Sequence, residues 1–99
     1  MTLTSSVGQK AAVLVVLPDG RAYLITEAGV SSLPAYRSYQ LWARVDGRSV
    51  SIGLLGRSPT DVAVQVTSNM TKFMVTIEPL GGTLTPTTPV VMQSPTISI

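Results

Sequence analysis

The chain has 99 residues, enough for one domain with a small hydrophobic core and too few for a second domain. Its hydrophobic fraction of 44% is ordinary for a globular protein, whereas its charged fraction of 12% is about half the usual share. The net charge of +2 is too small to attract polyanions, so nucleic acid is not expected as a partner. The absence of Cys and His excludes disulfides, thiolate chemistry and the commonest metal ligand.

The amino-terminal residues divide into a polar segment and an apolar run. Residues 1–10 are rich in Ser, Thr and Gly, and we expect them to form a flexible leader. Residues 11–17 are continuously apolar, but the run is far shorter than the roughly 20 residues that cross a bilayer. Pro18 follows where a signal peptide would place small residues. The run therefore predicts a buried strand at the start of a domain over residues 11–93.

The pairs Asp19-Gly20 and Asp46-Gly47 are typical of hairpin turns, because glycine accepts the positive φ that tight turns demand. A two-residue turn at Asp46-Gly47 fixes a register in which every apolar residue on one face meets an apolar residue across the hairpin. The resulting pairs are Ala43 with Val50, Leu41 with Ile52, and Tyr39 with Leu54.

The other face of this hairpin carries Gln40, Trp42 and Arg44. An exposed tryptophan beside an arginine could stack on a sugar, a base or a peptide, so these three residues are a candidate partner-binding face. Alternatively, the Pro-Thr segment near residue 86 folds over Trp42, which we favour because large aromatic side chains are usually mostly buried. Gly53 supports burial, since its position diagonal to Trp42 would leave room for the indole ring.

Alternation with a period of two predicts half-buried strands over residues 62–66 and 73–77, and residues 21–25 and 89–93 add two more. The total is about seven short strands at spacings of roughly 8–12 residues. The chain is therefore predicted to be an all-β antiparallel two-sheet β-sandwich, with a small β-barrel as the alternative. Residues 94–99 form either a tail or an edge strand, because Thr96 to Ile99 alternates well enough to pair.

Catalytic and cofactor sites are not expected. Without histidine, only Lys10 and Lys72 could activate a nucleophile, and no Ser-x-x-Lys or Gly-x-Ser-x-Gly motif is present. The five carboxylates are scattered along the chain rather than clustered as a hard-cation site requires. We predict a non-enzymatic protein without metal or cofactor.

Five short runs follow one another along the chain: Leu33-Pro34, Tyr39 to Trp42, Ser51 to Gly53, Val75 to Gly82 and Pro86 to Val91. Their order and spacing resemble the C-terminal domain of the anti-sigma-K factor family. The resemblance covers roughly residues 13–93. Leu80 departs from the family pattern, which usually has a small residue there, as does Thr88, where glycine often follows Pro-Thr. The residues that carry the family signature are Tyr39, Gln40, Leu41, Trp42, Gly53, Glu78, Pro79, Gly81, Gly82, Pro86 and Thr87.

The resemblance implies a non-catalytic regulatory role. In such proteins a cytoplasmic segment holds a sigma factor inactive, one helix crosses the membrane, and this domain lies outside. Proteolysis within the membrane then frees the sigma factor. The chain would be the extracytoplasmic domain of a single-span membrane protein, with a sigma factor and membrane proteases as partners through other segments and no membrane insertion of its own.

The alternative is a free-standing module that binds a cell-envelope ligand through the Trp42 face. The two hypotheses differ in whether the reading frame continues upstream of Met1 into about 20 apolar residues and a cytoplasmic domain.

Overall fold

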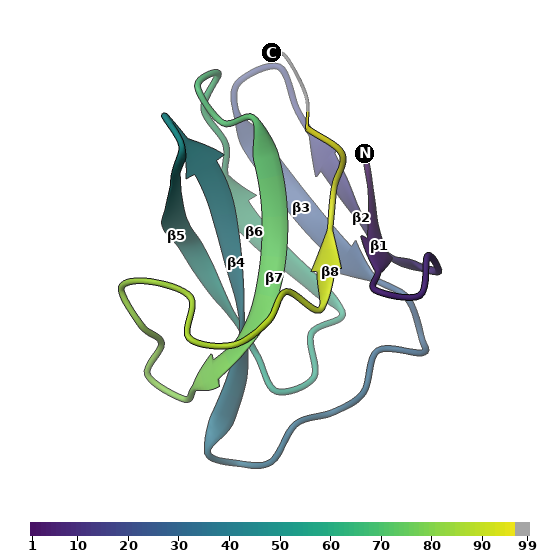
Figure 1. Cartoon of the computed structure of the whole chain (residues 1–99). Coiled ribbons are helices and arrows are strands. Elements are labelled where there is room, and N and C mark those ends of the chain that lie inside the picture. The colour runs from purple at the N-terminus through teal and green to yellow at the C-terminus, as the bar shows by residue number, and fades with distance from the viewer. Residues whose placement is uncertain (97–99) are drawn as a thin grey trace.

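The computed structural model describes residues 1–96, which form eight antiparallel strands. The strands form one sheet in the order β5-β4-β7-β8-β1-β2-β3-β6 (Figure 1). Residues 1–96 contain no helix that is long and apolar enough to cross a bilayer. The strands are β1 (Thr2–Ser5), β2 (Lys10–Val16), β3 (Arg21–Thr26), β4 (Arg37–Val45), β5 (Arg48–Gly56), β6 (Asp61–Gln65), β7 (Lys72–Pro79) and β8 (Met92–Gln93).

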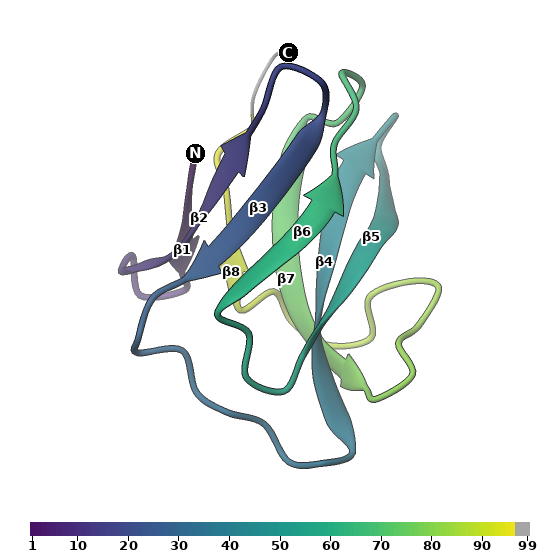
Figure 2. The ribbon, with the colours of Figure 1, turned by 180° about the vertical axis from the view of Figure 1, so that it is seen from behind.

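The sheet curls until its two end strands, β5 and β6, lie next to each other (Figure 2). Gly53 on β5 approaches β6 so closely that a Cβ atom there would lie 3.3 Å from Cγ1 of Val64. No hydrogen-bonded ladder joins the two strands among residues 1–96, so the barrel is nearly, not fully, closed. The prediction of an all-β fold is confirmed, and the architecture fits the small-barrel alternative. The role predicted for Gly53 is wrong, because it faces Val64 across this seam and not the indole of Trp42.

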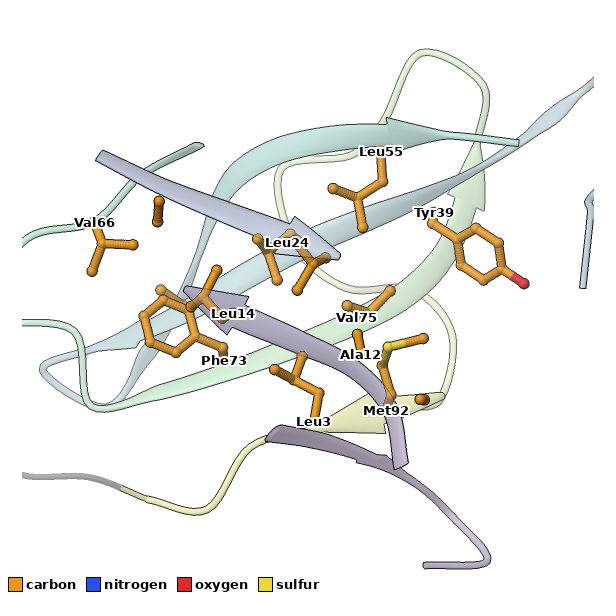
Figure 3. Close-up of a cluster of buried hydrophobic side chains, with 14 of the residues drawn as sticks. Leu3, Ala12, Leu14, Leu24, Tyr39, Leu55, Val66, Phe73, Val75 and Met92 are labelled. Atoms are coloured by element: carbon orange, nitrogen blue, oxygen red, sulfur yellow. The ribbon is translucent and has the colours of Figure 1, made fainter. Parts of the chain in front are cut away.

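Inward-facing side chains from opposite walls of the barrel fill one core (Figure 3). Leu14 and Leu24 come from the neighbouring strands β2 and β3, and Phe73 and Val75 come from β7. All four side chains are fully buried. Phe73 and Val75 occupy alternate positions along β7, as expected for a strand with one face toward the interior.

The prediction of a flexible leader is wrong. Thr2–Ser5 forms β1, which pairs with β2 on one side and with β8 on the other. Leu3 is fully buried in the core, and the Met1 ammonium group donates a hydrogen bond of 2.7 Å to the Leu14 carbonyl. Ser and Thr are common in loops, but the alternation around Leu3 suits a strand once two neighbouring strands supply partners.

The turn of the β4–β5 hairpin is the predicted one. Asp46 has φ of 50° and Gly47 has φ of 77°, as a two-residue turn with two positive φ angles requires. Ala43 lies opposite Val50, so the register next to the turn is confirmed.

Farther from the turn the predicted register of this hairpin is wrong. The ladder shifts between Leu41 and Trp42 and again between Tyr39 and Gln40. Each shift places an extra residue in β5, so Leu41 lies opposite Gly53 and Tyr39 lies opposite Gly56. Such bulges bend a strand and increase its twist, which a sheet needs in order to curl into a small barrel.

The carboxyl-terminal region differs from the predicted strand over residues 89–93, because only Met92–Gln93 forms β8. Beyond it, Ser94 is tied to β7: its N–H donates to the Phe73 carbonyl and its hydroxyl accepts from the Phe73 N–H, both at 2.9 Å. The predicted pairing of Thr96 to Ile99 falls largely on residues 97–99, which lie outside the described residues.

Candidate functional site

Trp42 is fully buried, yet it is not part of the core inside the barrel. Along β4, Leu41 and Ala43 face the interior, so Trp42 points to the outer side of the sheet. Residues 80–91, which we call the strap, leave the end of β7 and cross this outer side before reaching β8 (Figure 1). A large aromatic side chain is therefore enclosed on the outer face of the sheet, as the interpretation favoured from the sequence expected.

The candidate partner-binding face is not assembled as a surface. Trp42 is 0% exposed and Gln40 is 2% exposed, while Arg44, the third predicted residue, is exposed by itself near the hairpin turn. The structure thus buries Trp42, as the alternative favoured from the sequence predicted.

A chain of hydrogen bonds leads from Trp42 to Glu78. The indole Nε1 donates to Oγ1 of Thr76 at 2.7 Å, and Oγ1 of Thr76 donates to Oε2 of Glu78 at 2.6 Å. Thr76 and Glu78 point to the same side of β7, and β7 is the direct neighbour of β4. The ladder between these two strands therefore sets the spacing of the chain.

The carboxylate of Glu78 is fully buried and is surrounded by neutral donors. Thr87 in the strap donates its N–H to Oε2 at 3.1 Å and its hydroxyl to Oε1. No cationic side chain of residues 1–96 forms an ion pair with Glu78. Burial alone would raise the pKa of Glu78, but the hydrogen bonds from Thr76 and Thr87 outweigh it and hold the pKa below the usual range of a glutamate.

Metal binding finds no support at this carboxylate. Among residues 1–96 no group of three or more acidic side chains could share an ion. The oxygens of Glu78 are already occupied by donors from Thr76 and Thr87, so the chemistry of this group is to accept hydrogen bonds.

Gln40 fastens the beginning of the strap. Its Nε2 donates to the Thr83 carbonyl at 3.0 Å and to Oγ of Ser51 at 2.7 Å, while its Oε1 accepts from the Thr83 N–H at 3.1 Å. A side-chain amide thus pairs with the strap backbone on both its donor and acceptor groups, as a neighbouring strand would.

Thr88 fastens the end of the strap. Its hydroxyl donates to the Ile77 carbonyl at 2.7 Å and accepts from the Ile77 N–H at 3.2 Å. These backbone groups lie on the edge of β7 beyond the short ladder with β8, which covers only Met74 and Val75. The threonine hydroxyl therefore satisfies an edge that no strand pairs.

The two leucines of the strap point away from the barrel, whereas Val91 at its end packs against the core. Leu84 is 94% exposed and Leu80 is 54% exposed. Gly82 has φ of 79°, and a Cβ atom there would lie 2.9 Å from Cδ2 of Leu54. The backbone of the strap approaches β5 closely at Gly82, while its leucines contribute little apolar burial.

Five of the eleven family signature residues belong to the strap or to the hydrogen-bonded residues beneath it: Gln40, Trp42, Glu78, Gly82 and Thr87. Tyr39 and Leu41 instead face the core, where the Tyr39 hydroxyl donates to the Ser31 carbonyl at 2.6 Å and burial raises the pKa of Tyr39.

Three threonines of this network, Thr76, Thr83 and Thr88, were missed by the sequence analysis. Of the three, only Thr76 could have been linked to Glu78 from the sequence, because the two residues lie at alternate positions and so share one face of β7. A polar face of this kind is normally solvated, so the alternation itself gave no reason to expect a buried network.

The family described as anti-sigma-K factor rskA, C-terminal, matches residues 1–93. Comparison with curated proteins and comparison with solved structures each gave no match. The matched range includes β1, in agreement with the place of that strand in the middle of the sheet. The chain therefore belongs to the anti-sigma-K factor rskA C-terminal family and is a regulatory domain of an anti-sigma factor.

Proposed function

We propose that this chain is the extracytoplasmic domain of a single-span membrane anti-sigma factor and that it regulates a sigma factor through controlled proteolysis. The family match over residues 1–93 is the observation that carries the proposal. In this arrangement the sigma factor is bound by another segment of the parent protein. The barrel governs how readily membrane-associated proteases cut the parent protein.

The physical basis of such control is that proteases cut unpaired, extended chain and act slowly on paired strands. In this domain β4 is paired over its whole length, and its neighbour β7 is paired with it from Lys72 to Pro79. A signal that loosens or tightens the barrel would change the rate of the first cut without any catalytic group in the domain.

The side of the membrane can be tested by cysteine labelling, because the chain contains no cysteine of its own. Arg48→Cys places a thiol at an exposed residue beside the hairpin turn, and Ala43→Cys places one at a buried residue of β4. The variants are made in the full-length parent protein, with any cysteines elsewhere replaced by serine. We expect a membrane-impermeant maleimide to label Arg48→Cys on intact cells and Ala43→Cys only after denaturation. Labelling of Arg48→Cys only after lysis would show that the extracytoplasmic assignment is wrong.

Control of the sigma factor can be tested separately, with Leu41→Asp in the full-length parent protein. Leu41 is fully buried, and a charge there should unfold the barrel, whereas the matched change Val15→Asp falls on a side chain that is 41% exposed. We expect Leu41→Asp to shorten the parent protein on an immunoblot and to raise a sigma-dependent reporter, and Val15→Asp to do neither. An unchanged reporter in cells where Leu41→Asp is demonstrably cut would refute control by proteolysis.

A further inference from the structure

Between Leu80 and Val90 the strap's own side chains make mostly polar contacts with the barrel, whereas Val91 at its end packs against the core. Gln40, Glu78 and the Ile77 backbone hold it at Thr83, Thr87 and Thr88, while Leu80 and Leu84 remain largely exposed. Segments that bury little apolar surface can open at a lower free energy than the whole domain. The strap therefore has the composition of a locally opening unit.

The barrel does not need the strap for its own connections. The ladder between β4 and β7 runs unbroken over residues 37–44 and 72–79, and the core inside the barrel includes no side chain from residues 80–90. Lifting residues 80–90 would uncover Trp42, Thr76 and Glu78 on the outer face, while Val91 stays packed against the core.

We propose that the strap opens as a unit on a folded barrel, and that the ionised carboxylate of Glu78 holds it closed through its hydrogen bonds with Thr87. The carboxylate accepts from both the backbone and the side chain of Thr87, and charge-assisted hydrogen bonds are roughly twice as strong as neutral ones. Neutralising Glu78 weakens both of its hydrogen bonds with Thr87 and leaves the β4–β7 ladder intact.

Glu78 is the group that titrates where the carboxylate meets the strap. Its hydrogen-bond partners, Thr76 on β7 and Thr87 on the strap, do not titrate in the physiological range, and neither does Trp42 on β4. The strap has no charged residue, and the guanidinium of Arg37, whose backbone pairs with Pro79, lies 5.7 Å from the centroid of the Tyr36 ring. Protonation of Glu78 is thus the one charge change at this site.

Trp42 reports the opening directly, because it is the sole tryptophan and is fully buried when the strap is closed. The test compares acrylamide quenching of its fluorescence in the unmodified chain, in Glu78→Gln and in the control Glu27→Gln, which changes an exposed carboxylate. Loss of a charge-assisted hydrogen bond should increase the open population about ten-fold or more. We expect Glu78→Gln to be quenched more strongly with an unchanged far-UV circular dichroism spectrum, and Glu27→Gln to match the unmodified chain.

A second variant keeps the test decisive if Glu78→Gln does not fold. Thr87→Val removes the hydroxyl donor but keeps the backbone N–H, so we expect a smaller increase in Trp42 quenching. In the unmodified chain the quenching should also rise in acid, below the usual titration range of a glutamate. Unchanged quenching in a folded Glu78→Gln or Thr87→Val, or quenching that rises only in step with loss of the circular dichroism signal, would overturn the proposal.

Discussion

Glu78 is buried beside neutral donors, and this environment makes the stability of the domain depend on pH. Its pKa is lower in the folded than in the unfolded chain, so the stabilisation is fully present above the unfolded pKa. It is lost as the pH falls through the folded pKa. We therefore expect the free energy of unfolding to decrease below about pH 4, and to do so less in Glu78→Gln. Urea unfolding of both chains at pH 7 and pH 3 measures this, and an equal decrease would contradict the role of Glu78.

Trp42 contributes both packing and a donor, and two substitutions separate these contributions. Trp42→Phe keeps most of the ring but loses the N–H that Thr76 accepts, and we expect it to destabilise the domain by about 1–2 kcal/mol. Trp42→Ala also leaves a cavity and should cost about 3–5 kcal/mol. Urea unfolding at neutral pH gives both values. If Trp42→Phe were as stable as the unmodified chain, the hydrogen bond to Thr76 would have no energetic role.

Within the strap, two adjacent glycines should respond differently to the same substitution. Gly82 has positive φ and lies against Leu54, whereas no atom lies within 4 Å of a Cβ atom at Gly81 and its φ is not positive. We expect Gly82→Ala to destabilise the strap by about 1–2 kcal/mol and Gly81→Ala to be close to neutral. Trp42 quenching and urea unfolding of the two variants provide the comparison. Equal effects would mean that the turn at Gly82 is not a constraint.

At the scale of strands, β1 should be indispensable. Leu3 is fully buried in the core, so Leu3→Ala should cost about 2–5 kcal/mol, as other large-to-small core changes do. Thermal unfolding followed by circular dichroism measures the loss, and Val7→Ala is the matched control, because Val7 is 76% exposed in the following turn. A flexible leader would instead predict no effect of either substitution.

Patterns within one strand or one turn were readable from the sequence. The turn at Asp46-Gly47 and the alternation along β7 predicted their elements, because glycine conformation and side-chain periodicity act locally. The two bulges in β5 were not predictable in this way, because they are related to the curvature of the whole barrel and not to a local pattern.

The candidate site was predictable in its residues and partly in its arrangement. The sequence identified Trp42, Glu78 and Thr87 as parts of one signature and favoured burial of Trp42, but it gave no sign of the hydrogen bonds that join these residues. A buried polar network depends on which segments meet in space, and the alternation of Thr76 and Glu78 looks the same for a solvated face.

The whole molecule combines two parts with different modes of attachment. The barrel is joined by backbone ladders and an apolar core. Backbone hydrogen bonds hold the ends of the strap, at Leu80, Gly82 and Val91, whereas residues 83–90 are joined to the barrel by hydrogen bonds that involve the side chains of Gln40, Glu78 and Thr88. In a domain proposed to regulate proteolysis, such a division would let one segment change state while the rest stays folded.

Native-state amide hydrogen exchange of the unmodified chain tests this division most directly. The amides compared are those of Thr83 and Thr87 in the strap and of Leu41 and Val75 in the barrel. We expect the strap amides to exchange through an opening that is insensitive to low urea concentrations, and the barrel amides only through global unfolding, which depends steeply on urea. If all four amides shared one free energy of opening and one urea dependence, the strap and the barrel would open together. That result would contradict a strap that opens on a folded barrel.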